Sequence, residues 1–236
     1  VHTRTIKTYS VTEDDKYRIF RPLEQYPPEF IEALLMQEDK FFYTHAGVNF
    51  VALVKAGWET YIKKSRRIGA STITMQVAKL KYNLYTKNIP GKINQIIKAF
   101  YLELCFSKDE ILEAYLNLAP VGGNVEGFET GAWYYFNKNI RQLNLSEIIM
   151  LCVLPQNPIK RAPTTHRTPS ELISARKILF ETWIEKHPED EDKKIFMDMQ
   201  MSVKCSFPNE ARHFTEMIYH EKGLKICVWI NPYIGQ

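Results

Sequence analysis

Hydrophobic positions recur with the period of an α-helix along most of this chain. After Pro27 and Pro28, the run Phe30–Met36 is mostly apolar, and it predicts a buried helix because proline is tolerated in a first helical turn. Between residues 91 and 104, apolar side chains follow the spacing of one helix face, at Ile93, Ile96, Ile97, Phe100, Tyr101 and Leu104. We expect this face to pack on the core.

A polar stripe runs beside that apolar face, at Lys92, Gln95, Ala99 and Glu103. Polar side chains around a small alanine fit the wall of a cleft, and they fit an ordinary helix boundary equally well. The pattern leaves both interpretations open. The choice matters because lysine and amide side chains in a cleft can bind a phosphate oxygen.

Local signals mark where other helices begin and end. Ser107 and Glu110 have the spacing of a capping box, and an apolar helix face follows them. Pro120 and the glycine pair at 122 and 123 end that helix in a loop. Pro169 precedes a further predicted helix.

The resulting organisation is one main body between two shorter segments. Residues 1–26 form a leader with a possible strand at residues 18–20, residues 27–200 form the main domain, and residues 201–236 form a short β-prone linker. The acidic run 189–192 is expected to open a helix late in the main domain. Periodicity alone shows only that the fold class is mainly α.

Composition describes an ordinary globular chain. The 236 residues, 45% hydrophobic and 25% charged, allow one large core and do not indicate disorder. The net charge of +4 suits anionic lipid or pyrophosphate rather than nucleic acid, for which no basic-aromatic motif is present. No apolar run of about 18 residues predicts a transmembrane helix. The four cysteines lack metal-ligand spacing, so we expect no metal centre and mostly buried free thiols.

Two candidate sites stand out. Glu38 and Asp39 follow the first predicted helix, with His45 and a glycine soon after. A carboxylate where a buried helix meets a loop is partly desolvated, so it can act as a base near neutral pH. A helix end with solvated acids is the alternative.

The second candidate site is rich in hydroxyls and lysines. Three hydroxyls at Ser71, Thr72 and Thr74 have no acid nearby, and lysines follow at Lys79, Lys81, Lys87 and Lys92. Hydroxyls and ammonium groups without carboxylates suit a phosphate or pyrophosphate. The alternative is a polar loop followed by a solvated basic face.

These blocks, in this order and spacing, resemble the peptidoglycan glycosyltransferases of family 51, the glycan-polymerising domains of class A penicillin-binding proteins and of monofunctional transglycosylases. The matched positions are Glu38, Asp39, Phe42, His45 and Gly47, then Gly69–Gln76 with Lys79, and then Ser107–Asn117. The finer resemblance is to the 1C-type branch, in Thr12–Arg18, Leu118–Gly127 and Val153–Pro158. The end of the chain resembles the link into a transpeptidase domain, which would begin where this sequence stops.

The sequence departs from the wider family at several positions. That family has glutamate where this chain has Gln95, glutamine at Met75, and arginine at Gly91 and at Lys87. The residues at Met75, Gly91 and Gln95 look usual for the 1C-type branch. Asn49 stands where an aspartate is common.

The resemblance implies a lysozyme-like, two-lobed fold that polymerises lipid II into β-1,4-linked glycan with inversion. It implies that Glu38 is the general base and that Asp39 completes the catalytic pair by supporting the local structure. The implied substrate-binding residues are His45, Ser71, Thr72, Gln76, Lys79, Lys87, Lys92 and Gln95. Lysines and hydroxyls would stabilise the polyprenyl pyrophosphate that leaves, and a divalent cation such as Mg²⁺ can assist them.

The resemblance also implies a location. Residues 50–67 combine an apolar stretch and two aromatic residues with a basic cluster, which suits the interface of an anionic bilayer. An amphipathic core helix that ends in a charged loop is the other interpretation. The expected partners are lipid II, the growing lipid-linked glycan, the membrane surface and other cell-wall synthesis proteins, and no nucleic acid. The expected place is the periplasmic face of the bacterial cytoplasmic membrane.

Two other functions remain open at the level of sequence. A hydrolase on the same scaffold would normally need two carboxylates that flank the scissile bond, and Gln95 removes the obvious partner of Glu38. A non-catalytic or partner-dependent lipid II-binding module is compatible with the departures at Asn49 and Gln95.

Overall fold

The computed structural model describes residues 16–49, 71–198 and 201–207, and it is mainly helical, as the sequence predicts. The α-helices are α1 Pro28–Glu38, α3 Ile73–Lys81, α4 Ile89–Cys105, α5 Lys108–Leu118, α6 Phe128–Phe136, α7 Leu145–Val153, α8 Pro158–Arg161, α9 Ser170–Lys186 and α10 Ile195–Asp198. The 3-10 helices are η1 Leu23–Gln25, η2 Phe42–Thr44, η3 Ile140–Gln142 and η4 Pro188–Lys194.

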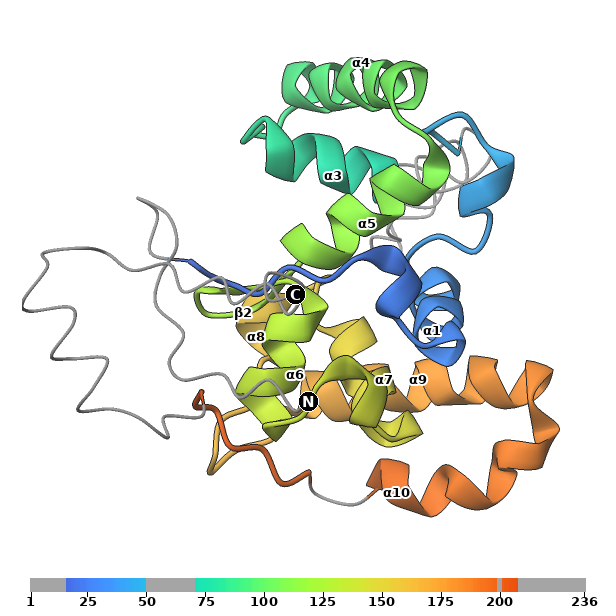
Figure 1. Cartoon of the computed structure of the whole chain (residues 1–236), viewed down its shortest axis with the longest axis vertical. Helices are drawn as coiled ribbons and strands as arrows, with labels where there is room; N and C mark the ends of the chain where they lie inside the picture. Colours follow the sequence, from blue (N-terminus) through green and yellow to red (C-terminus); the bar gives the residue numbers. More distant parts are fainter. Residues whose placement is uncertain (1–15, 50–70, 199–200, 208–236) are drawn as a thin grey trace, which may run out of the picture.

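The described helices form two lobes, which confirms the two-lobed expectation. Helices α3 and α4 pack on each other in the smaller lobe, and α1, α7 and α9 pack together in the larger one (Figure 1). Helix α5 contacts α3 and α4 of the smaller lobe as well as α6 and η1, so it connects the two lobes. The first predicted site lies where α1 ends, and the second lies on α3 and α4.

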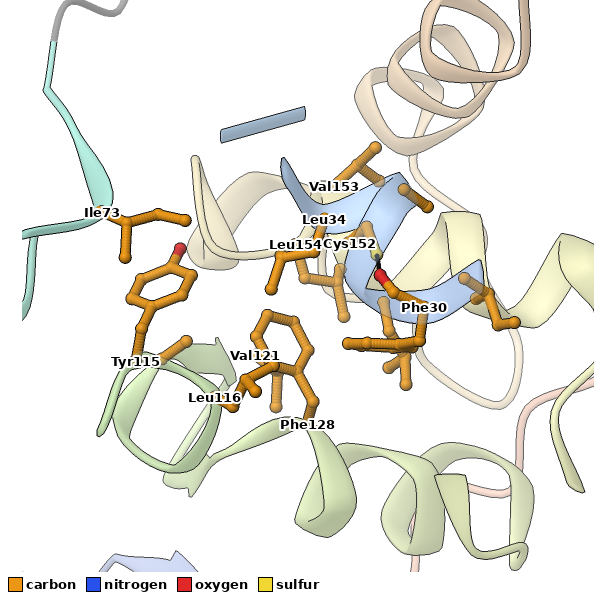
Figure 2. Close-up of a cluster of buried hydrophobic side chains, with 14 of the residues drawn as sticks. Phe30, Leu34, Ile73, Tyr115, Leu116, Val121, Phe128, Cys152, Val153 and Leu154 are labelled. Atoms are coloured by element: carbon orange, nitrogen blue, oxygen red, sulfur yellow. Dashed lines mark hydrogen bonds between the residues drawn. The ribbon is translucent and has the colours of Figure 1, made fainter. Parts of the chain in front are cut away.

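The larger lobe has a dense apolar core. Phe30 on α1 packs edge-on against Phe128 at the start of α6, with 5.2 Å between ring centroids, and both are fully buried. Figure 2 shows Leu34 of α1 facing residues 152–154 at the end of α7. Burial of one such aromatic side chain contributes about 1.5–3 kcal/mol, so this cluster holds α1 firmly in the larger lobe.

A small sheet joins the start of the described chain to the main body. Strand β1 (Tyr17–Arg18) pairs in parallel with β3 (Val125–Glu126), which pairs antiparallel with β2 (Pro120–Gly122). The strand begins one residue before the predicted position at 18–20. Lys16 and Arg18 both form ion pairs with Glu126, which tie this segment to the body.

Several local signals are confirmed. Ser107 caps α5 through the predicted capping box, in which Glu110 Oε2 accepts a hydrogen bond from the Ser107 backbone N–H over 2.8 Å. Pro28 is the first residue of α1, and α9 begins directly after Pro169. The acidic run opens a 3-10 helix, η4, rather than an α-helix.

The expectation for the apolar face of α4 was wrong in part. Ile96 and Phe100 pack against the core, but Ile93, Ile97, Tyr101 and Leu104 are exposed, Leu104 by 86%. The polar stripe is the buried face instead, with Gln95 only 2% exposed and Ala99 completely buried. The reason is the partner: Gln95 bonds the Met75 carbonyl of α3, Lys92 bonds the Ser71 hydroxyl just before α3, and the small alanine allows a close approach.

Other expectations concern the ends of the chain and the cysteines. The predicted membrane segment at 50–67 lies outside the described residues. In the described part of the C-terminal linker, residues 201–207, there is no strand; it lies along α6 through backbone bonds to Tyr134 and Tyr135. Cys152 is buried and free as expected, Cys205 is free and half-buried, and Cys105 is free but exposed at the end of α4, which corrects the expectation for that residue. None of the described helices could span a membrane.

Candidate functional site

Glu38 is the last residue of α1, and its carboxyl group is enclosed although the residue as a whole is partly exposed. Oε2 accepts a hydrogen bond from Gln76 Nε2 over 2.6 Å. Oε1 is buried and has no hydrogen-bond partner among the residues that the structure describes. Burial raises the pKa of the Glu38 carboxyl to about 7, against smaller opposing effects of the Gln76 hydrogen bond and of Arg161. A carboxyl group with this pKa can accept a proton near neutral pH.

Asp39 follows Glu38 and joins three parts of the chain. Both of its oxygens lie 3.0 Å from His45 Nε2, and Oδ2 also accepts a bond from the backbone N–H of Ile73 over 3.0 Å. Because Ile73 is the first residue of α3, the carboxylate also faces the positive end of that helix. Asp39 therefore holds the end of α1, the η2 loop and the start of α3 in register, and His45 is held by Asp39.

The hydroxyls of Thr72 and Thr74 are used inside the protein. Thr72 is the N-cap of α3: its Oγ1 accepts from the Met75 N–H over 3.2 Å and donates to the Gly47 carbonyl over 2.5 Å. Thr74 donates to Glu103 over 2.5 Å. A Cβ on Gly47 would lie 2.8 Å from the Glu103 side chain, and the residue has a φ of +82°, so the loop needs glycine there.

The basic cluster centres on Lys92. Its Nζ donates to Ser71 Oγ over 2.7 Å and to Gln95 Oε1 over 2.9 Å. Within the described ranges, no carboxylate forms an ion pair with Lys92. Burial and, to a smaller extent, the charge of Lys79 lower the pKa of the Lys92 ammonium. A half-buried cation beside a hydroxyl, with a second lysine in electrostatic reach, can bind an anionic group.

The two other predicted lysines are both exposed. Lys79 is exposed on α3, within electrostatic reach of Lys92. Lys87 is exposed in the segment between α3 and α4. The structure thus brings Ser71, Lys79, Lys92 and Gln95 together.

Helix α3 connects the two candidate sites. Gln76 reaches Glu38 from this helix, and Lys79 follows Gln76 by three residues, which places the two side chains on one helix face at about 5–6 Å between Cβ atoms. Helix α3 therefore carries a residue that bonds Glu38 and, one turn further along, a lysine whose charge acts on Lys92.

Sequence reasoning missed two residues near Glu38. Arg161 on α8 lies within electrostatic reach of Glu38, and its Nη1 donates to the Val153 carbonyl over 2.7 Å and to Gln156 over 3.2 Å. Tyr115 on α5 donates to Gln76 Oε1 over 3.3 Å. Tyr115 lies in the block 107–117 that resembles the family, but its position in the pattern indicates a packing residue. Arg161 follows the block 153–158, and no helical periodicity marks it.

The structure also bears on the implied divalent cation. Across residues 16–49, 71–198 and 201–207, no group of three or more His, Cys, Asp or Glu side chains is placed to hold a metal ion. Mg²⁺ is commonly bound by one or two carboxylates together with substrate phosphates, so the implied cation stays a prediction.

A comparison with protein families adds an independent finding. The family model described as Transglycosylase matches residues 3–183. Penicillin-binding protein 1C of Escherichia coli (strain K12) is 40% identical over 159 residues, which cover 67% of this chain and 20% of that protein. Penicillin-binding protein 4 of Bacillus subtilis (strain 168) is 32% identical over 156 residues, 66% of this chain and 25% of that protein.

Further relatives include penicillin-binding protein 1A of Neisseria gonorrhoeae, which is 39% identical over 61% of this chain and 18% of its own length. The chain thus spans a fifth to a quarter of its first two relatives. Among solved structures, the 2.6 Å crystal structure of penicillin-binding protein 1A from Haemophilus influenzae aligns with a TM-score of 0.46 and 19% identity, over 87% of this chain and 21% of that one.

Proposed function

Because this chain belongs to the transglycosylase family, we propose that it is a peptidoglycan glycosyltransferase that polymerises lipid II into β-1,4-linked glycan strands with inversion. The observation that carries the proposal is the enclosed carboxyl group of Glu38, which bonds Gln76 of α3. The same helix carries Lys79, whose charge acts on Lys92, and Lys92 forms no ion pair with a carboxylate among the described residues. The substrate class and the enzyme activity are also those that the family name and the relatives suggest.

Glu38 is the proposed general base. The acceptor is a sugar hydroxyl, which is a weak nucleophile at neutral pH and must lose its proton as it attacks. With its pKa raised to about 7, the Glu38 carboxylate is basic enough to accept that proton and is still ionised in a large share of molecules at neutral pH. Oε1 is the oxygen without a protein partner in the described residues, so it is the one we assign to the acceptor.

Lys92, Ser71 and Lys79 are the groups that we propose stabilise the leaving group. When the bond from the sugar to the polyprenyl pyrophosphate breaks, negative charge grows on the phosphate oxygens. A pyrophosphate leaves readily once that charge is met, so this side needs cations and hydroxyl donors rather than a general acid. The amide of Gln95 holds Lys92 without neutralising it, which keeps its charge for the phosphate.

One essential carboxylate is sufficient for this reaction. Inversion from a pyrophosphate donor requires a single displacement and no covalent intermediate. A glycosidase instead needs a second carboxyl group across the bond. Asp39, the nearest carboxylate in sequence, is occupied by His45 and by the α3 backbone, and Gln95 is neutral. These contacts favour the polymerase over the hydrolase.

We further infer that the exposed face of α4 lies against the membrane that holds the lipid substrate. Along one side of α4 the exposed apolar residues are Ile89, Ile93, Ile97, Tyr101 and Leu104. Lys98 lies 4.9 Å over the Tyr82 ring, and Lys81 lies 5.9 Å over the Phe106 ring, so ammonium groups border this face. Apolar side chains beside lysines suit an anionic bilayer. Work at the periplasmic face of the cytoplasmic membrane, with other cell-wall synthesis proteins, follows from the proposed substrate.

Polymerisation of purified lipid II in detergent tests the proposal. We expect glycan strands from the 236-residue chain, and a loss of at least about 100-fold in Glu38→Gln, because a positioned base contributes about 10²–10⁴-fold. Glu185→Gln, which neutralises an exposed acid on α9, is the matched control and should keep full activity. A chain that binds lipid II without lengthening it would instead support the non-catalytic or partner-dependent binding module. Omission of Mg²⁺ from the assay tests the implied cation.

A further inference from the structure

A buried tyrosine, Tyr115, bonds the hydrogen-bond partner of the proposed base. Tyr115 lies on α5 with no exposed surface, and its ring packs edge-on against Phe128 with 6.1 Å between centroids. Figure 2 shows its hydroxyl end on the side of Ile73, the first residue of α3. The hydroxyl donates to Gln76 Oε1 over 3.3 Å, and so it gives a core tyrosine a polar contact with the site.

The Gln76 side chain is bonded at both of its ends. Its Oε1 accepts from Tyr115, and its Nε2 donates to Glu38 Oε2 over 2.6 Å. An amide has one donor end and one acceptor end, so its orientation decides whether it attracts or repels an ionised carboxylate. Burial keeps the pKa of the Tyr115 hydroxyl well above its usual value, so this hydroxyl remains a donor at neutral pH.

We propose that Tyr115 is a positioning residue: by donating to Gln76 Oε1, it turns the NH2 end of the amide toward Glu38 and favours the ionised, base form of that residue. The inference rests on the proposed function, because it assigns Glu38 the role of base. Without the hydroxyl, the Gln76 amide can rotate and present its carbonyl to Glu38, which then keeps its proton to a higher pH. A tyrosine that only fills the core would change stability and leave this titration untouched.

Titration of Glu38 is the direct test. In the 236-residue chain labelled with carboxyl-¹³C glutamate, NMR follows each carboxyl group against pH, and Glu38→Gln identifies the Glu38 resonance. We expect Tyr115→Phe to raise the Glu38 pKa by about half a unit, the size of one neutral hydrogen bond that acts indirectly. Gln76→Met, which removes the bond to the carboxylate itself, should raise it by about one unit or more.

Two further variants separate positioning from packing. Tyr135→Phe removes another buried hydroxyl, one that donates to the Val121 carbonyl over 2.9 Å, and it should leave the Glu38 titration unchanged. In the double variant Tyr115→Phe with Gln76→Met, the pKa should equal that of Gln76→Met alone, because Tyr115 acts through Gln76. In the polymerisation assay, the acid limb of kcat/KM should move to higher pH in Tyr115→Phe, with about threefold lower activity below neutral pH and normal activity on the alkaline side.

The inference is overturned if Tyr115→Phe folds and leaves the Glu38 pKa unchanged, or if the two single-variant shifts add in the double variant. If Tyr115→Phe does not fold, Gln76→Met decides: a raised Glu38 pKa supports the hydrogen-bonded chain, and an unchanged one refutes it. These outcomes are separate from the proposed function. If the chain makes no glycan but shows the expected NMR shifts, the proposed polymerase activity is refuted. The proposal that Tyr115 orients Gln76 would still be supported.

Discussion

On α4, the Lys92 ammonium donates to Gln95 Oε1 one turn further along the helix, over 2.9 Å, and the other end of the Gln95 amide donates to the Met75 carbonyl of α3 over 2.6 Å. The buried amide therefore fixes the lysine relative to α3. Because an amide is neutral, it places the ammonium without cancelling its charge, which suits the proposed role of Lys92 in binding the leaving pyrophosphate.

Replacement of Lys92 should affect catalysis more than folding. We expect Lys92→Met to lower kcat/KM by about 10²–10³-fold, since a preorganised donor at a developing charge has that effect. Its aliphatic stem would still pack, so the melting temperature should change little. Steady-state polymerisation kinetics measure this, with Lys194→Met, at an exposed lysine of η4, as the control. Activity within threefold of wild type would show that Lys92 does not stabilise the leaving group.

Gln95→Glu should raise the pKa of Lys92, because a carboxylate beside the ammonium stabilises its charged form. The wild-type pKa of Lys92 is lowered by burial, so deprotonation of Lys92 should set the alkaline limb of the activity profile. We expect that limb to move to higher pH in Gln95→Glu. The lost bond to the Met75 carbonyl should cost about 1–3 kcal/mol of stability. A limb at the wild-type position would show that Lys92 does not control it.

Glu38 should make stability depend on pH. Its pKa is about 7 in the folded protein against 4.5 for an unperturbed glutamate, so the folded state binds the proton more tightly than the unfolded state. This contribution to stability is fully present below pH 4.5 and is lost as the pH rises to about 7.

Glu38→Gln should therefore be more stable than wild type at pH 8, by up to about 3 kcal/mol, and nearly equal to it at pH 4.5. Urea unfolding at the two pH values measures the difference. An equal difference at both pH values would contradict the raised pKa.

Arg161 should act on Glu38 through charge. Its positive charge lowers the pKa of Glu38, so Arg161→Met should raise that pKa and move the acid limb of kcat/KM to higher pH. Lys160→Met, at the neighbouring position of α8, is the control and should leave the limb in place. Because Arg161 also bonds the Val153 carbonyl, thermal unfolding should accompany the kinetics. An unchanged limb in a folded Arg161→Met protein would refute the electrostatic effect.

The exposed face of α4 should bind anionic membranes. Ile97→Ser with Leu104→Ser should reduce sedimentation with phosphatidylglycerol vesicles by severalfold, because each change removes an exposed apolar side chain from the contact. The melting temperature should stay the same, since neither residue is buried. Ile178→Ser, at an exposed position of α9, serves as the control. Equal vesicle binding by all three proteins would exclude this face as the contact.

The sequence by itself was sufficient for features that depend on neighbours in the chain. The capping box of α5 and the proline start of α1 are local, because the groups that satisfy a helix end lie within one turn of it. The order and spacing of the motifs were also enough to identify the family, and the position of Glu38 at a helix end already suggested a desolvated carboxyl group.

Only the tertiary structure decided which face of α4 is buried and what surrounds Glu38. A helix with an apolar face and a polar face can bury either one. The Met75 carbonyl and the Ser71 hydroxyl, which meet Gln95 and Lys92, come from about twenty residues away, beyond the reach of periodicity. Gln76 and Arg161 are still further from Glu38 along the chain. The pKa of that carboxyl group depends on their distances in space, because electrostatic and hydrogen-bond energies follow geometry and not sequence separation.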